Sequence, residues 1–161
     1  MHILKVFTNI YLLVPAFSWL VAQILKTIIT AFVTKKIYFS RLVGDGGMPS
    51  THSATVMCLC IMTGWVGGFA TPVFALSFIF AAVVMRDALG VRREAGKHAS
   101  SIKQLADAVN GLFHSKDSEI KTENLKVLVG HTPLQVFFGA LLGIVVSISC
   151  ILIFDLPHPI M

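Results

Sequence analysis

The chain has 161 residues, of which 55% are hydrophobic and only 13% are charged, and its mean hydropathy is +0.80. Soluble domains carry roughly 25% charged residues, so a water-soluble globule of this length would lack the side chains to cover its surface. The composition excludes a cytosolic enzyme, a disordered tail and a secreted disulfide scaffold. It predicts an all-α integral membrane protein with a single domain over residues 1–161.

The charge balance indicates which partners the protein contacts, and the positions of the cysteines indicate their role. Thirteen Lys and Arg stand against 8 Asp and Glu, which gives a net charge of +5. In a membrane protein this excess reports on topology and on anionic lipid, so we expect contact with membrane lipids and none with nucleic acid. Cys58, Cys60 and Cys150 lie inside apolar runs and are interpreted as packing residues.

Apolar runs predict about four membrane spans, at residues 10–33, 54–69, 72–85 and 136–154. The first run lacks the cleavage site of a signal peptide. The third has only 14 residues and ends at Arg86–Asp87, which is short for a full crossing. The predicted fold is therefore a bundle of about four helices.

A polar segment, residues 86–130, separates the third run from the fourth. Apolar side chains recur within it at helical spacing, which predicts an amphipathic helix at the membrane surface or docked on the spans; they are Ala95, Ala99, Ile102, Leu105, Ala106, Val109 and Phe113. A charged stretch, Lys116–Leu128, is typical of a solvated helix. Because eight Lys and Arg lie in 86–126, the segment is predicted to be cytoplasmic, with both termini outside.

This topology brings polar residues from distant parts of the sequence to one membrane face. The start of the second span, the end of the third and the start of the fourth all lie there, with Ser50, His52, Arg86, Asp87 and His131. Such convergence favours a functional site.

The loop before the second span has the composition of an anion site. Gly46 and Gly47 let the backbone approach a ligand closely, and the helix that starts near Ser50 and Thr51 offers unpaired N–H groups. A plain loop with a serine cap explains the serines equally well, but it does not explain His52.

Further candidates carry charge or a titratable ring. His131 also opens a span, and two histidines on one face can act as nucleophile and general acid. Arg92 and Arg93 suit the phosphate of a lipid headgroup, or simply mark the cytoplasmic edge. Asp87 needs a partner at the end of an apolar run, and Lys26 is an intramembrane lysine that serves function or snorkels to the interface.

Together these motifs resemble the divergent branch of the type 2 phosphatidic acid phosphatase superfamily, which is related to the vanadium haloperoxidases. The resemblance covers nearly the whole chain. It rests on GGMPSTHSA (46–54), RDALGVRREAG (86–96) and GHTPLQVFFGALLG (130–143), together with Gln23 and Lys26.

The resemblance implies hydrolysis of a phosphate ester through a phosphohistidine, without a metal or other cofactor. PSTH is similar to the superfamily's Pro-Ser-Gly-His motif, which implies that Ser50 binds phosphate and that His52 is the general acid. HTPLQVFFG resembles the end of the third motif, which implies that His131 is the nucleophile.

The chain also departs from the superfamily pattern. Gln135 stands where an aspartate orients the nucleophile, Thr51 replaces a glycine, and an Arg-Pro pair is missing. We hypothesise that Arg92 and Arg93 replace the lost cations and that Asp87 replaces the lost carboxylate. The small number of predicted spans leaves room for a homodimer.

The sequence thus predicts a cytoplasm-facing membrane phosphatase that acts on a lipid phosphate or pyrophosphate. His131, His52, Asp87 and Gln135 are the predicted catalytic residues; the predicted phosphate-binding residues are Lys26, Gly46, Gly47, Ser50, Thr51, Arg92 and Arg93. The alternative is a non-catalytic protein that binds anionic headgroups or phosphate in a binding, transport or assembly role. A catalyst needs both histidines, whereas a binder needs only the cations and the loop.

Overall fold

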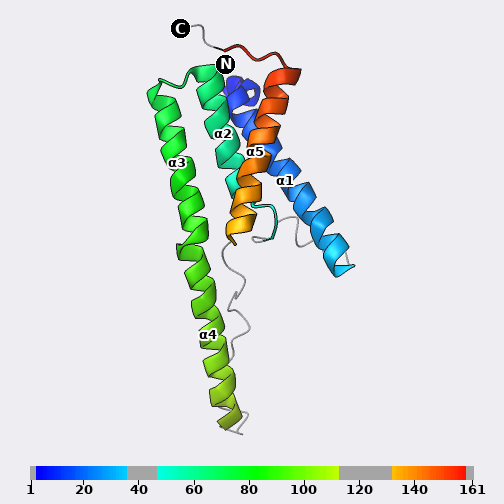
Figure 1. Cartoon of the computed structure of the whole chain (residues 1–161), viewed down its shortest axis with the longest axis vertical. Coiled ribbons are helices and arrows are strands. Elements are labelled where there is room, and N and C mark those ends of the chain that lie inside the picture. The colour runs from blue at the N-terminus through cyan, green and yellow to red at the C-terminus, as the bar shows by residue number, and fades with distance from the viewer. Residues whose placement is uncertain (1–2, 36–46, 113–131, 159–161) are drawn as a thin grey trace.

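The computed structural model describes residues 3–35, 47–112 and 132–158. Within these ranges all regular structure is helical (Figure 1), so the predicted all-α membrane bundle is confirmed. The elements are η1 (Ile3–Thr8), α1 (Ile10–Thr34), α2 (Thr51–Gly67), α3 (Pro72–Leu89), α4 (Val91–Leu112) and α5 (Pro133–Ile153).

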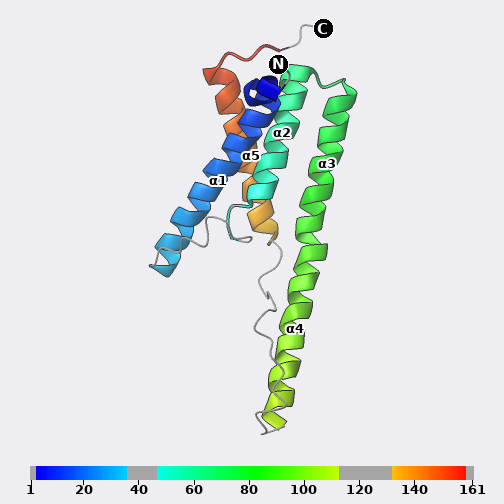
Figure 2. The same ribbon diagram turned by 180° about the vertical axis from the view of Figure 1, so that it is seen from behind.

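Helix α2 is the centre of the bundle. Helices α1, α3 and α5 all pack against it, and the two opposite views show it between them (Figure 2). Its buried side chains are small or slender, among them Ala54, Cys58 and Met62. The bulky side chains of the outer helices, such as Phe32 of α1 and Leu76 of α3, are 81% and 71% exposed. This distribution suits a surface that meets lipid.

Helix α5 approaches α2 at unusually short range because it presents glycines. A methyl group on Gly139 would lie 2.4 Å from the Ser50 carbonyl oxygen, and one on Gly143 would lie 2.3 Å from that of Ala54. One turn further, the Ser147 hydroxyl donates to Gly143 O at 2.7 Å. Gly139 and Gly143 form the G-x-x-x-G pattern that lets membrane helices pack backbone to backbone.

Three stretches of the described chain are long and apolar enough to cross a membrane: α1, the joined α3–α4 stretch Pro72–Gly111, and α5. Helix α2 has 17 residues and runs alongside them in both views. A rise of about 1.5 Å per residue makes α2 about 26 Å long, near the thickness of the hydrocarbon layer. The four-crossing topology stays a prediction.

Helix α3 runs past the point where the third apolar run was predicted to end. It continues through Arg86 and Asp87 to Leu89, since a charged pair does not interrupt backbone hydrogen bonding. Gly90 N–H bonds Arg86 O at 2.9 Å, and Glu94 N–H bonds Gly90 O at 3.0 Å, so α4 follows at once. Helix α4 extends along the line of α3 beyond the other helices (Figures 1 and 2).

The amphipathic helix that the sequence predicts within residues 86–130 corresponds to helix α4. It has the largest separation of polar and apolar faces, but its Ile102 and Leu105 are 51% and 66% exposed. Phe113 and the charged stretch Lys116–Leu128 lie outside the described residues.

The helix ends define one end of the bundle, which we call the site end. There α1 and α3 finish and α2 and α5 begin, whereas α1 begins and α5 finishes at the opposite end (Figures 1 and 2). The site end is where the topology argument placed the polar residues.

Candidate functional site

The start of α2 is fixed by Ser50. This residue is the N-cap, and its Oγ accepts hydrogen bonds from Ser53 N–H at 3.3 Å and from the Ser53 hydroxyl at 3.0 Å. Its own N–H donates to the Gln135 carbonyl at 3.0 Å, which ties α2 to the start of α5. Ser50 is fully buried. The serine cap considered from the sequence is therefore present, and it also joins the two motifs that contain the predicted histidines.

Lys26 lies against the glycine loop. It is only 2% exposed although it belongs to an apolar helix. A methyl group on Gly47 would lie 3.1 Å from Lys26 Cδ and 3.2 Å from Cγ, so the glycine makes room for the aliphatic part of the lysine. Gly47 also has φ of +100°, a conformation that glycine adopts at no cost. The loop and the lysine thus form one unit.

This unit is positively polarised. A helix N-terminus carries a partial positive charge and unpaired N–H groups, and α2 begins shortly after Gly47, the loop residue that packs on Lys26. A buried ammonium group requires anionic or polar surroundings. The two features therefore favour the same kind of ligand, an anion such as a phosphoryl group.

His52 and Thr51 occupy the first turn of α2. Thr51 is 6% exposed, and its carbonyl accepts a hydrogen bond from Thr55 Oγ1 at 2.8 Å. His52 is half-buried. It follows Ser50 by two residues, so it stays close to the loop that contacts Lys26.

The start of α5 explains Gln135 locally. Thr132 is the N-cap, its hydroxyl accepts from Gln135 N–H at 3.4 Å, and Gln135 Oε1 accepts from Thr132 N–H at 3.0 Å. This reciprocal pair is a capping box, and the sequence pattern Thr-x-x-Gln was a readable signal for it. The Gln135 carboxamide thus caps helix α5. The sequence also predicts that it orients His131. His131 and Gly46 lie outside the described residues.

Asp87 belongs to a different surface of the site end. It is half-buried in the last turn of α3, where it lines a broad cavity of about 720 Å³ together with Arg86 and apolar residues of the same helix. Arg92 and Arg93 open α4 just beyond it. The structure brings together Lys26, Gly47, Ser50 and Gln135; the roles predicted for Asp87 and the two arginines stay predictions.

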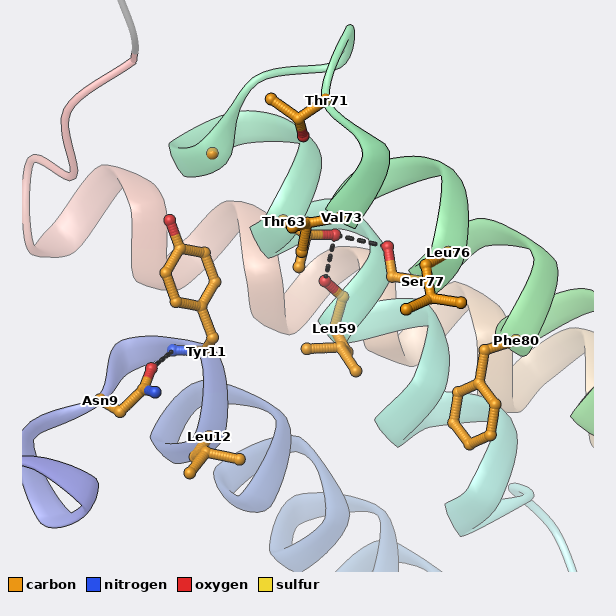
Figure 3. A pocket seen from close by; sticks show the side chains of 11 residues that line it. Asn9, Tyr11, Leu12, Leu59, Thr63, Thr71, Val73, Leu76, Ser77 and Phe80 are labelled. Atoms are coloured by element: carbon orange, nitrogen blue, oxygen red, sulfur yellow. Dashed lines mark hydrogen bonds between the residues drawn. The ribbon is translucent and has the colours of Figure 1, made fainter. Parts of the chain in front are cut away.

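A groove of about 620 Å³ near the opposite end offers no comparable chemistry. It lies between α1 and α3, with α2 as its floor (Figure 3). Thr63 Oγ1 bonds Leu59 O at 3.0 Å and Ser77 Oγ at 2.6 Å, and Ser77 Oγ bonds Phe74 O at 2.8 Å. These hydroxyls are used within the bundle, and the described residues that line the groove include no charged side chain.

Comparison with known proteins agrees with the motifs. Residues 7–146 match the Divergent PAP2 family. The chain is 38% identical over 151 residues to the uncharacterized membrane protein YuiD of Bacillus subtilis (strain 168), which covers 90% of this chain and 96% of the relative. No solved structure matches. The chain is therefore a membrane protein that belongs to the Divergent PAP2 family.

Proposed function

We propose that the protein is a membrane phosphatase that hydrolyses a lipid phosphate or pyrophosphate. The observation that carries this proposal is the contact between buried Lys26 and Gly47 at the N-terminus of α2. In this contact the aliphatic stem of Lys26 lies against the loop that leads into the Pro-Ser-Thr-His motif, where α2 begins. Family membership supports the reaction class.

The phosphoryl oxygens would be held by charge and by backbone donors. Lys26 supplies the ammonium group, and the N–H groups of Gly46, Gly47 and Thr51 supply neutral donors. Ser50 adds a hydroxyl whose orientation is set by its neighbour. Because Ser50 Oγ accepts two hydrogen bonds from Ser53, its own hydrogen is left for donation to a ligand oxygen. Arg92 and Arg93 are the further cations that the sequence predicts for phosphate binding.

The covalent steps would use two histidines. His131 attacks phosphorus, the bond to the leaving oxygen breaks, and His52 gives that oxygen a proton. Water then attacks the phosphohistidine, His52 takes the proton from this water, and inorganic phosphate leaves. Gln135 or Asp87 would hold the tautomer of His131. Lys26 and Ser50 are buried, so a phosphoryl group reaches them only when the groups that cover them move.

The orientation and the assembly belong to this proposal as well. The basic residues of α4 favour a site end that faces the cytoplasm. Members of the main superfamily have more helices than this chain. In a homodimer, the second copy would supply them. A purely binding role is the second candidate, because Gln135 Oε1 is engaged in a capping box where the superfamily has an aspartate.

Phosphate release from lipid phosphates tests the proposal. Purified protein in detergent is offered phosphatidic acid, phosphatidylglycerol phosphate and a polyprenyl pyrophosphate, with chelator present. We expect release by the wild type and losses of at least about a hundredfold in His52→Ala and His131→Ala, the range of general acid–base and covalent catalysis.

The matched control is His98→Ala, an exposed histidine on α4 that should leave release unchanged. If folded wild-type protein releases phosphate from none of these lipids but still binds them, the hydrolase proposal fails and the binding role replaces it.

A further inference from the structure

A second, apolar surface begins at the same loop. Between α1 and α5 lies a groove of about 270 Å³, which we call the α1–α5 groove. Its described lining is apolar throughout. It includes Leu25 and Ile29 of α1, Met48 and Pro49 of the loop, and Leu142 and Val145 of α5.

The loop separates this groove from the cationic unit. Gly47 packs on the stem of Lys26, whereas the next two residues, Met48 and Pro49, form one end of the groove. Helix geometry explains how α1 serves both surfaces. Successive residues point about 100° apart around a helix, so Leu25 faces the groove while Lys26 faces the glycine.

Helix α5 also presents two faces, one to α2 and one to the groove. Gly139 and Gly143 meet the backbone of α2, and the adjoining stripe that includes Leu142 and Val145 lines the groove. Leu25, Ile29 and Val145 remain 37%, 39% and 52% exposed, so the groove is open on the outer surface of the bundle. In a membrane that surface meets hydrocarbon.

We propose that the α1–α5 groove binds the hydrocarbon chain of the lipid phosphate whose phosphoryl group lies at Lys26 and the glycine loop. This inference rests on the proposed function and adds where the chain of the substrate runs. Continuity carries it: in one loop, residues 47–49, the first residue packs on the aliphatic stem of Lys26 and the next two line the apolar groove. The α1–α3 groove of Figure 3 is larger, but its lining includes no charged side chain and it lies near the opposite end.

Photo-crosslinking tests the groove independently of turnover. The full chain in lipid nanodiscs is irradiated with phosphatidic acid that carries a diazirine in one acyl chain, and the labelled peptides are mapped by mass spectrometry. The comparison probe is phosphatidylcholine with the same chain. We expect the phosphatidic acid probe to label residues 138–145 and Met48 about tenfold more than the phosphatidylcholine probe, the discrimination that one well-placed contact gives.

Matched substitutions on α5 complete the test. Val145→Trp fills the groove and should lower labelling by phosphatidic acid about tenfold. Ile148→Trp is the control, because Ile148 is 47% exposed, close to the 52% of Val145, and does not line the groove. Equal labelling by both probes, labelling centred on the α1–α3 groove, or no effect of Val145→Trp would overturn the inference.

Phosphate release from the same phosphatidic acid is measured in parallel. Groove labelling by phosphatidic acid, together with no release from any of the three lipid phosphates, would overturn the proposed hydrolysis and keep the chain-binding site. Release together with labelling outside the groove would overturn the chain-binding site and keep the proposed hydrolysis.

Discussion

Lys26 can be recognised in the sequence and has a central role in the proposed phosphate binding. An ammonium group that leaves water loses several kcal/mol of solvation even after the protein relaxes around it. Lys26 is 2% exposed, so its surroundings must compensate for this loss. An incoming phosphoryl group would add a full negative charge to those surroundings, and its attraction to the lysine is strengthened where water is excluded.

Substitution of Lys26 should therefore remove phosphate binding. Inorganic phosphate at about 100 times its Kd stabilises a one-site protein by about 2.7 kcal/mol, so we expect it to raise the melting temperature of the wild type and not that of Lys26→Met. Thermal unfolding in detergent, with and without phosphate, measures the difference within each variant.

Lys97→Met is the control for that experiment. Lys97 is exposed and pairs with Glu94 at 2.6 Å, a surface ion pair worth about 0.5 kcal/mol or less. Its variant should keep the full phosphate-dependent rise. An equal rise in Lys26→Met would show that the lysine is structural.

At this scale the sequence predicted both Lys26 and Gly47 as phosphate-binding residues, but not the contact between them. A charged residue within an apolar run is visible in the sequence, and Gln135 could have been recognised as part of a capping box. The contact of Lys26 with Gly47 depends on how α1 is rotated against the loop, and no local pattern specifies that rotation.

Helix positions were easier to predict than helix contacts. The apolar runs at residues 10–33 and 136–154 correspond to α1 and α5, because long apolar stretches of good helix formers leave no other structure in lipid. The start of α2 at Thr51 follows from Ser50 as its cap. The central position of α2 depends on small residues that meet across helices, and the G-x-x-x-G pattern at 139–143 is the sequence feature that indicates such a contact.

Adding one methyl group at this contact should destabilise the bundle. In Gly139→Ala the new methyl would meet the backbone of Ser50, which cannot rotate away as a side chain can. We expect a loss of about 1–3 kcal/mol in the free energy of unfolding, the usual cost of overpacking. Denaturant unfolding in detergent measures the change.

Gly111→Ala is the opposite case on α4. Among the described residues, nothing lies within 4 Å of its methyl position, so the substitution should stabilise the helix by about 0.5–1 kcal/mol through the lower entropy of the unfolded chain. If Gly139→Ala matched Gly111→Ala in stability, the close α2–α5 contact would be contradicted.

The two ends of the molecule differ in the kinds of side chain that they carry. The basic residues of α4, such as Lys97 and Lys103, extend beyond the site end, whereas Trp65 lies at the opposite end, with Nε1 donating to Leu156 O at 3.4 Å and the ring edge-on to His158 at 4.8 Å. Aromatic rings of this kind favour the membrane interface, and basic residues favour the cytoplasmic side. Aromatic rings occur at both interfaces, so the basic residues alone predict that the site end faces the cytoplasm.

Cysteine labelling in cells of Bacillus subtilis that produce the protein checks this orientation. The native Cys58, Cys60 and Cys150 are buried, so a cysteine placed on the surface should dominate the reaction with a maleimide. Asp155→Cys, at the end opposite the site, should react with a membrane-impermeant maleimide on intact cells. Ser101→Cys, on the exposed side of α4, should react only after the cells are permeabilised. Labelling of Ser101→Cys and not of Asp155→Cys on intact cells would place the site end outside, where the proposed phosphatase would act on lipids of the outer leaflet.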